Sequence, residues 1–126
     1  MADALEPNRI TTLEQLDDLM AASSKIDVWM FKHSLICPTS DVAWSEFERF
    51  STRTAPGEAT AVVEIQRARE VSRAVEARTG IRHESPQVLL IRDGEAIWNA
   101  SHWAITEQTL GAAAARHSVA AVAGSA

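Results

Sequence analysis

The order of the predicted strands and helices constrains the fold of this chain more than any other feature. Two apolar segments rich in strand-forming residues, 25–32 and 59–65, are each followed by a helical pattern of apolar residues. Asp93-Gly94 then joins two further strands, 88–91 and 96–100, in a tight hairpin. Strands connected through a helix run parallel, whereas a hairpin adds an antiparallel pair. The sequence therefore predicts an α/β domain with a central four-stranded mixed sheet flanked by helices.

Local start and stop signals place four helices. Thr11 and Glu14 have the spacing of a capping box at the start of an extra N-terminal helix. Pro38 suits the first turn of the second helix, Gly80 ends the third, and the fourth begins near Thr106. The buried face of the second helix is expected to consist of Ala43, Phe47 and Phe50.

Composition and charge indicate one soluble domain, residues 1–126, with an ordered core of about 11–118 and a loose Ala-rich C-terminal tail. No apolar run approaches the roughly 20 residues that cross a bilayer, and the N-terminus lacks the pattern of a secretory signal. The net charge of −5, without a cluster of Lys and Arg, argues against nucleic-acid binding. A single cysteine fits a reducing compartment. We therefore expect a cytoplasmic protein that binds neither membranes nor nucleic acids.

Cys37, the lone cysteine, is expected between the first strand and the second helix, directly before Pro38. A thiolate is the form that attacks a disulfide, and the unpaired backbone N–H groups at a helix start favour a negative sulfur. His33 and Lys32 precede the cysteine by four and five residues, so either side chain adds positive field if it points at the sulfur. The alternative is a small buried hydrophobic residue. The Cys-Pro step at this junction favours a reactive thiol.

Ser40 stands three residues after Cys37, where two-cysteine redox motifs carry their second cysteine. A hydroxyl cannot resolve a mixed disulfide, so a reactive Cys37 needs a second thiol from solution. Ser40 either donates a hydrogen bond to the Cys37 thiolate or is an ordinary polar residue of the first helical turn. The sequence leaves both interpretations open.

Pro86 is expected immediately before the third strand. The thioredoxin fold has the element order strand–helix–strand–helix–strand–strand–helix. It carries a cysteine after the first strand and a proline before the third, as this sequence does. In thioredoxin-like proteins this proline is cis and lies against the reactive cysteine. The residue before it, here Ser85, offers its backbone N–H and C=O to the incoming disulfide. The alternative is a simple loop proline.

The histidines do not form a metal-ligand pattern. His83, His102 and His117 are scattered relative to Cys37 and match no short ligand motif, so no metal site is expected. His102 and Trp103 follow the fourth strand. They either approach the Cys37 loop or form a surface histidine beside a core tryptophan.

Several segments resemble the monothiol bacilliredoxins, a thioredoxin-like family of the bacillithiol system of some bacteria. The similarity runs from about Leu13 to Leu110 and is carried by residues 31–34, 37–40, 82–88 and 98–103. Its most specific parts are His-Glu-Ser-Pro-Gln at 83–87 and Ala-Ser-His-Trp at 100–103, because generic thioredoxins lack them. The chain departs from the family at Ile36 and Thr39, which flank Cys37 and so affect the expected choice of partner.

This resemblance implies a monothiol disulfide oxidoreductase in which Cys37 removes bacillithiol from S-bacillithiolated client proteins through a mixed disulfide. Free bacillithiol, a low-molecular-weight thiol, or a flavin-dependent bacillithiol disulfide reductase system would then restore Cys37. Bacillithiol is thus expected as a co-substrate, with no tightly bound cofactor. Two other functions stay open, namely a non-catalytic thioredoxin-fold binding module and a single-cysteine redox sensor.

Overall fold

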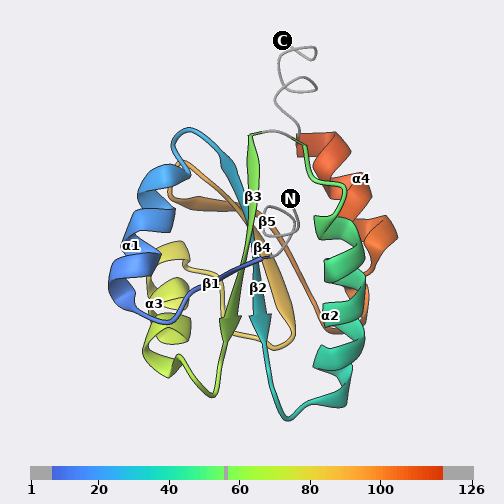
Figure 1. The fold of residues 1–126 in the computed structure, drawn as a ribbon, viewed down its shortest axis with the longest axis horizontal. Helices are drawn as coiled ribbons and strands as arrows, with labels where there is room; N and C mark the ends of the chain where they lie inside the picture. The colour runs from blue at the N-terminus through green and yellow to red at the C-terminus, as the bar shows by residue number, and fades with distance from the viewer. Residues whose placement is uncertain (1–6, 56, 118–126) are drawn as a thin grey trace.

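A five-stranded mixed sheet with helices on both faces forms the centre of the protein (Figure 1). The computed structural model describes residues 7–55 and 57–117. The strands are β1 (Asn8–Arg9), β2 (Asp27–His33), β3 (Glu58–Glu64), β4 (Gln87–Arg92) and β5 (Glu95–Ser101). The helices are α1 (Leu13–Ala22), α2 (Pro38–Ser51), α3 (Arg69–Thr79), α4 (Glu107–His117) and the short 3-10 helix η2 (His102–Ala104).

The strand order is β1-β3-β2-β4-β5, so β2 lies at the centre of the sheet. β2 and β3 are parallel, while β4 is antiparallel to β2 and β5 to β4, which confirms the predicted mixed sheet. β1 was not predicted, and its two residues pair in parallel with β3. Because β4 is antiparallel, its first residues lie at the edge of the sheet where β2 and β3 end, the lower edge in Figure 1.

Side chains of β2 alternate between two apolar core layers. Val28 and Met30 pack in the layer that contains side chains of α1 and α3. Trp29 and Phe31 pack in the layer beneath α2 and α4. The predicted buried face of α2 is confirmed, because Ala43, Phe47 and Phe50 all belong to this second layer. Burial of each large apolar side chain contributes about 1.5–3 kcal/mol, so both layers hold the helices firmly against the sheet.

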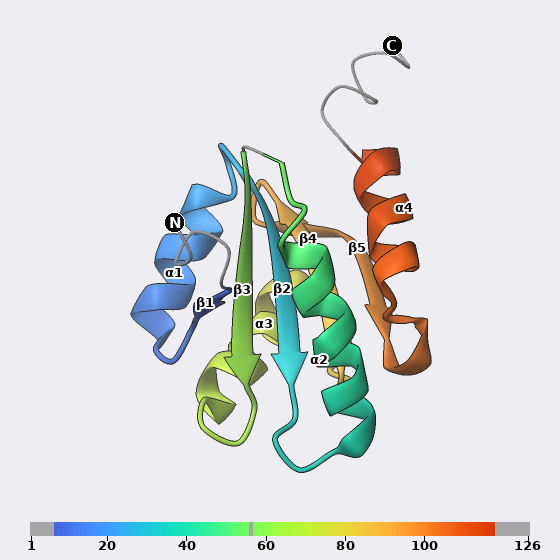
Figure 2. The same ribbon diagram turned by 45° about the vertical axis from the view of Figure 1, so that its right-hand side comes forward.

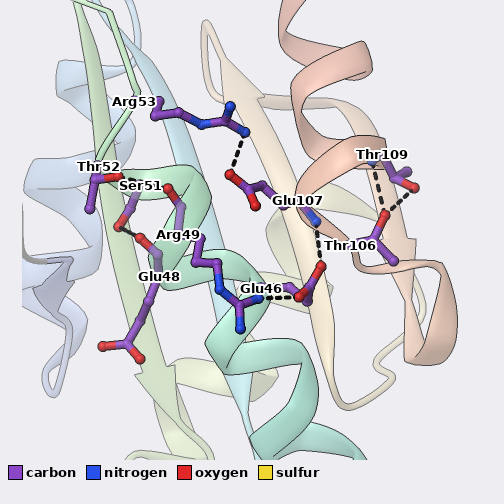
Figure 3. Close-up of polar contacts among 9 residues, drawn as sticks. All are labelled: Glu46, Glu48, Arg49, Ser51, Thr52, Arg53, Thr106, Glu107 and Thr109. Carbon is purple, nitrogen blue, oxygen red and sulfur yellow. Dashed lines mark hydrogen bonds and ion pairs between the residues drawn. The ribbon is translucent and has the colours of Figure 1, made fainter.

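Polar contacts also join α2 to α4 (Figure 3). The Glu46 carboxylate accepts a hydrogen bond from the backbone N–H of Glu107 at 2.9 Å and also pairs with Arg49. Arg53 reaches the Glu107 carboxylate at 2.6 Å. The Glu107 N–H is one of the unpaired donors of the first turn of α4, so Glu46 satisfies it from the neighbouring helix. The hydrogen bond from Glu107 lowers the pKa of Glu46.

The start of α1 differs from the prediction by one residue. The capping box consists of Thr12 and Gln15 rather than Thr11 and Glu14, with Gln15 N–H donating to Thr12 Oγ1 at 3.1 Å. The two pairs have the same spacing and chemistry, so the sequence pattern alone does not separate them. The N–H of Ile10, just before these residues, donates to Val62 O at 2.9 Å, so the chain is still paired with β3 at this point.

Two predicted turns are confirmed by their backbone geometry. Gly80 ends α3 with a φ of 73°, in the left-handed region that glycine enters without strain. Asp93 and Gly94 have φ values of 54° and 73°, as a tight hairpin between β4 and β5 requires. The described part of the chain contains no helix long and apolar enough to cross a membrane. The predicted loose tail falls beyond His117 and lies outside the described residues.

Lys32 is a fully buried cation in the central strand. Its exposed fraction is 0%, and its Nζ donates to the backbone carbonyl of Ser72 in α3 at 3.3 Å. Burial lowers the pKa of Lys32 from 10.5 to about 8, while the nearby Glu76 carboxylate partly offsets this effect. The charged form of Lys32 therefore opposes folding below pH 8.

Replacement of Lys32 by methionine is expected to remove this pH dependence. The folded protein binds fewer protons than the unfolded chain between about pH 8 and 10.5, so wild-type stability rises with pH across this window. The free energy of unfolding of the wild type, relative to Lys32→Met, is expected to increase by up to about 3 kcal/mol from pH 7.5 to 10.5. Urea denaturation of both proteins at several pH values measures this difference. Parallel stability curves would contradict the effect assigned to Lys32.

Candidate redox site

Cys37 is the N-cap residue of α2, four residues after the end of β2. Figure 2 shows the loop that joins β2 to α2. The backbone of Cys37 is extended, and its carbonyl accepts hydrogen bonds from the N–H groups of Ser40 at 3.0 Å and Asp41 at 3.3 Å. The thiol is free and half-buried. Within residues 7–55 and 57–117, no group forms a hydrogen bond with the sulfur. Cys37 therefore places an unengaged thiol at the amino end of a 14-residue helix.

Ser40 supports the loop before Cys37 from inside the protein. Its side chain is 0% exposed, and its Oγ accepts the backbone N–H of Ser34 at 2.9 Å and lies 2.8 Å from His33 Nδ1. When Nδ1 is the acceptor, the hydroxyl proton is donated to His33 and is not available to another group. The structure thus gives Ser40 a role that the sequence did not indicate, namely a link between the end of β2 and α2.

His33 is buried against α2. Its ring stacks on Trp44 with centroids 5.3 Å apart, and its Nε2 lies 4.0 Å from Asp41 Oδ1. Burial lowers the pKa of His33, although the carboxylates of Asp41, Glu64 and Glu48 partly oppose this effect. The imidazole is therefore mainly neutral near pH 7 and supplies little positive field.

Lys32 points to the opposite face of the sheet from His33. Adjacent residues of a strand alternate between faces, and the Lys32 ammonium lies against Ser72 of α3. Lys32 and His33, the two candidate cations, therefore contact other groups and not Cys37. Cys37 itself lies at the amino end of α2.

Gln66 anchors the same loop from the end of β3. Its Oε1 accepts the N–H of Leu35 at 2.8 Å, and its Nε2 donates to Ser34 Oγ at 3.1 Å. The N–H of Ile65 donates to His33 O at 2.9 Å and continues the pairing of the two strands. Gln66 was not identified from the sequence. Gln66 directly follows the second predicted strand, and the end of that strand meets the Cys37 loop. This position was the sequence signal that could have identified it.

Ser85 and Pro86 lie at the same edge of the sheet as the Cys37 loop. The peptide bond between them is cis, and the pairing of Lys32 with Gln87 places Pro86 beside the end of β2. Pro86 is buried, and its carbonyl accepts the N–H of His102 at 3.0 Å. In the part of the chain that the structure describes, the backbone N–H and C=O of Ser85 form no hydrogen bond. Ser85 therefore has backbone groups available to an added strand.

Glu84 fastens this segment to the end of β5. Its Oε2 accepts a hydrogen bond from Ser101 Oγ at 2.5 Å and lies 3.2 Å from His102 Nε2. The hydrogen bond from Ser101 lowers the pKa of Glu84, and the field of His102 contributes in the same direction. His102 has a φ of 56°, in the left-handed region that non-glycine residues seldom adopt. The turn after β5 is thus held against the residue before Ser85.

Four large apolar side chains of the described residues are exposed, namely Leu35, Ile36, Val42 and Trp103. Ile36, directly before Cys37, is 81% exposed, and Trp103 is 70% exposed. A core position for Trp103, one of the two alternatives from the sequence, is therefore wrong. Within the described ranges, no group of three or more His, Cys, Asp or Glu residues is arranged to hold a metal ion.

Replacement of Ser40 by alanine is expected to destabilise the protein by about 1–3 kcal/mol, because it leaves the buried Ser34 N–H without its acceptor. Ser45→Ala is the matched control, since Ser45 is exposed on the same helix and bonds only to Asp41 O at 3.3 Å. The control is expected to change stability by at most about 0.5 kcal/mol. Urea denaturation measures both values. Equal small effects would contradict the role assigned to Ser40.

Comparison with solved structures identifies the fold. A protein described as "a putative oxidoreductase with a thioredoxin fold" is 26% identical and superposes with a TM-score of 0.75, over 85% of this chain and 92% of that chain. The thioredoxin of Malassezia sympodialis is 18% identical, with a TM-score of 0.71 over 90% of this chain and 92% of that one. Fasciola hepatica thioredoxin is 16% identical, with a TM-score of 0.70 over 87% and 98% of the two chains. The predicted thioredoxin-like fold is confirmed.

The family model of the monothiol bacilliredoxin BrxC matches residues 8–110. The match spans β1 to the first turn of α4 and includes the Cys37 loop, Ser85 and Pro86. Together with the fold, it supports a thiol redox function. The chain belongs to the monothiol bacilliredoxin family.

Proposed function

We propose that this protein removes bacillithiol from S-bacillithiolated proteins through a mixed disulfide on Cys37. The proposal rests on the observation that the segments containing Cys37 and Ser85 lie at the same edge of the sheet. A free thiol at a helix start and a residue whose backbone groups form no hydrogen bond within the described ranges both lie at this edge. The residue three positions after the cysteine is the buried Ser40, so this position supplies no resolving thiol. The proposed cellular setting is the cytoplasm of a bacterium that makes bacillithiol.

In the first step, the Cys37 thiolate attacks the bacillithiol sulfur of a client–bacillithiol disulfide. A disulfide forms between Cys37 and bacillithiol, and the bond between bacillithiol and the client breaks. The client cysteine leaves as a thiolate and takes a proton from solvent. The client is reduced in this step, while Cys37 carries the disulfide.

In the second step, the thiolate of free bacillithiol attacks the bacillithiol sulfur of the mixed disulfide. Cys37 leaves as a thiolate, and bacillithiol disulfide is released. A separate flavin-dependent reductase system would then reduce bacillithiol disulfide to two thiols. The chain itself needs no metal or tightly bound cofactor for either exchange.

Backbone and apolar contacts would orient the client in this scheme. The N–H and C=O of Ser85 are placed to pair with an extended client segment in the manner of an added strand. Ile36, directly before Cys37, is exposed and offers apolar area to the same segment. Pro38 has no backbone N–H, so the N–H donors of α2 nearest to Cys37 belong to the residues after Pro38. His102 and Trp103, in the short helix η2 that contacts α2, would lie at the border of the client-binding surface.

Release of the client thiol tests the proposal. The reduced protein is expected to liberate the thiol of a bacillithiolated client, and Cys37→Ser to liberate none above the uncatalysed rate. Ser45→Ala, which leaves the site intact, is expected to match the wild type. Each exchange conserves the number of thiols, so the release is measured on the client itself, by intact-mass spectrometry, as the loss of the mass of one bacillithiol. Equal release by the wild type and Cys37→Ser would contradict the proposal, and absence of release by the wild type would favour a binding module or a sensor.

Replacement of Ser40 by cysteine is expected to make the site dithiol. Residue 40 is one helical turn from Cys37, so the new thiol can attack the Cys37–bacillithiol disulfide and release bacillithiol within the same chain. Wild-type protein treated with bacillithiol disulfide is expected to gain one bacillithiol in a mixed disulfide. Ser40→Cys is expected instead to lose the mass of two hydrogen atoms, as bacillithiol disulfide is reduced to two bacillithiol molecules. Ser40→Ala controls for loss of the hydroxyl. Equal accumulation of the bacillithiol adduct in wild type and Ser40→Cys would show that the two positions cannot exchange.

A further inference from the structure

A cavity of about 210 Å³ opens beside α3, on the face of the sheet opposite α2 and α4. Its walls are Ile65, Arg69, Ser72, Arg73, Glu76 and His83. None of these residues takes part in the exchange chemistry at Cys37. The cavity is smaller than the roughly 300–1,000 Å³ of sites for drug-sized ligands, so it suits a compact group rather than a nucleotide.

Arg69 and Arg73 supply the positive charge of this cavity. They are four residues apart on α3, so their side chains leave the same face of the helix. Neither forms an ion pair with a carboxylate in the described ranges. Six other arginines do form such pairs, namely Arg9, Arg49, Arg53, Arg67, Arg78 and Arg92. Arg69 and Arg73 therefore bring to one cavity two guanidinium groups that have no carboxylate partner within the described residues.

The wall of the cavity also contains polar groups, of which Ser72 is buried and His83 is exposed. Ser72 is 4% exposed, and its Oγ lies 3.4 Å from His83 Nδ1. Beneath it, the buried Lys32 ammonium bonds to the Ser72 carbonyl and adds a third positive charge. Glu76 is the one acidic residue of the wall, and its carboxylate is engaged by the backbone N–H of His83 at 2.6 Å. Burial, together with the charge of Lys32, lowers the pKa of His83, so its ring is mainly neutral near pH 7.

We propose that this cavity binds a compact dianion, with Arg69 and Arg73 as its principal donors. Guanidinium groups match the oxygen geometry of phosphates and carboxylates, and two of them one turn apart suit a ligand with two negative charges. The Ser72 hydroxyl and the His83 ring supply neutral hydrogen-bonding groups on the wall of the cavity. The site does not depend on the function proposed for Cys37.

Titration of the full-length reduced protein with inorganic phosphate and, separately, with succinate tests the proposal. Backbone amide shifts are recorded by NMR at constant pH and at an ionic strength fixed with sodium chloride. At least one anion is expected to produce saturable shifts at residues 69, 72, 73 and 83. Tighter binding of phosphate would assign the site to a phosphate group, and tighter binding of succinate to a dicarboxylate.

The double variant Arg69→Gln/Arg73→Gln is expected to bind that anion at least roughly tenfold more weakly, since two charge-assisted donors are lost. Arg116→Gln is the matched control, because Arg116 is an exposed arginine of α4, on the other face of the sheet. It is expected to retain the wild-type dissociation constant. All three substituted positions are exposed, so the fold should be retained, and circular dichroism checks this. Unsaturable shifts with both anions, or equal weakening by the double variant and by Arg116→Gln, would overturn the proposal.

Discussion

The backbone pairing of β2 with β4 determines where the chemistry of this protein is located. Lys32 pairs with Gln87, so the loop that follows β2 and the Ser85–Pro86 step that precedes β4 meet at one edge of the sheet. Cys37 belongs to the first segment, and the free backbone groups of Ser85 belong to the second. The two segments are about 50 residues apart in the sequence, and neither makes a site alone. A shift of one residue in this register would move Ser85 and turn every side chain of β4 to the other core layer.

A second set of interactions holds the Cys37 loop in place without engaging the sulfur. Ser40 links Ser34 to His33 from inside α2, and Gln66 holds Ser34 and Leu35 from the end of β3. Ser40 thus takes the position of a second redox cysteine but forms part of the support of the loop. This arrangement is consistent with a monothiol site, because the same residue that stabilises the loop cannot resolve a disulfide. Helix α2, which presents the cysteine, is in turn tied to α4 through Glu46 and Glu107.

Much of this fold follows from local patterns in the sequence. The apolar periodicity of α2, the glycine that ends α3 and the Asp93-Gly94 hairpin each specify a local structure, and the structure has all three. β1 was missed because two residues are too short to show an alternating pattern. The start of α1 was placed one residue early because two equivalent capping pairs overlap.

The candidate site was harder to predict, because its supports are long-range. The position of Cys37 followed from local signals, but the anchors of its loop did not. Gln66 and Ser34 are 32 residues apart, and nothing in their local sequences indicates the bond between them. The burial of Lys32 was also not apparent, since a charged residue at the end of a strand is usually solvated. Trp103 could be assigned to the core or the surface from its residue type, and its exposure depends on the turn that follows β5.

In the proposed exchange, the sulfur of Cys37 accepts bacillithiol from a client. The direct test is a single-turnover reaction between equal amounts of the reduced protein and a client that carries bacillithiol on one cysteine. Intact-mass spectrometry measures both proteins after the reaction. The client is expected to lose the mass of one bacillithiol while this protein gains it, and the added mass is expected to map to the peptide containing Cys37. Loss of bacillithiol from the client without its appearance on Cys37, or a disulfide between Cys37 and the client itself, would rule out this exchange.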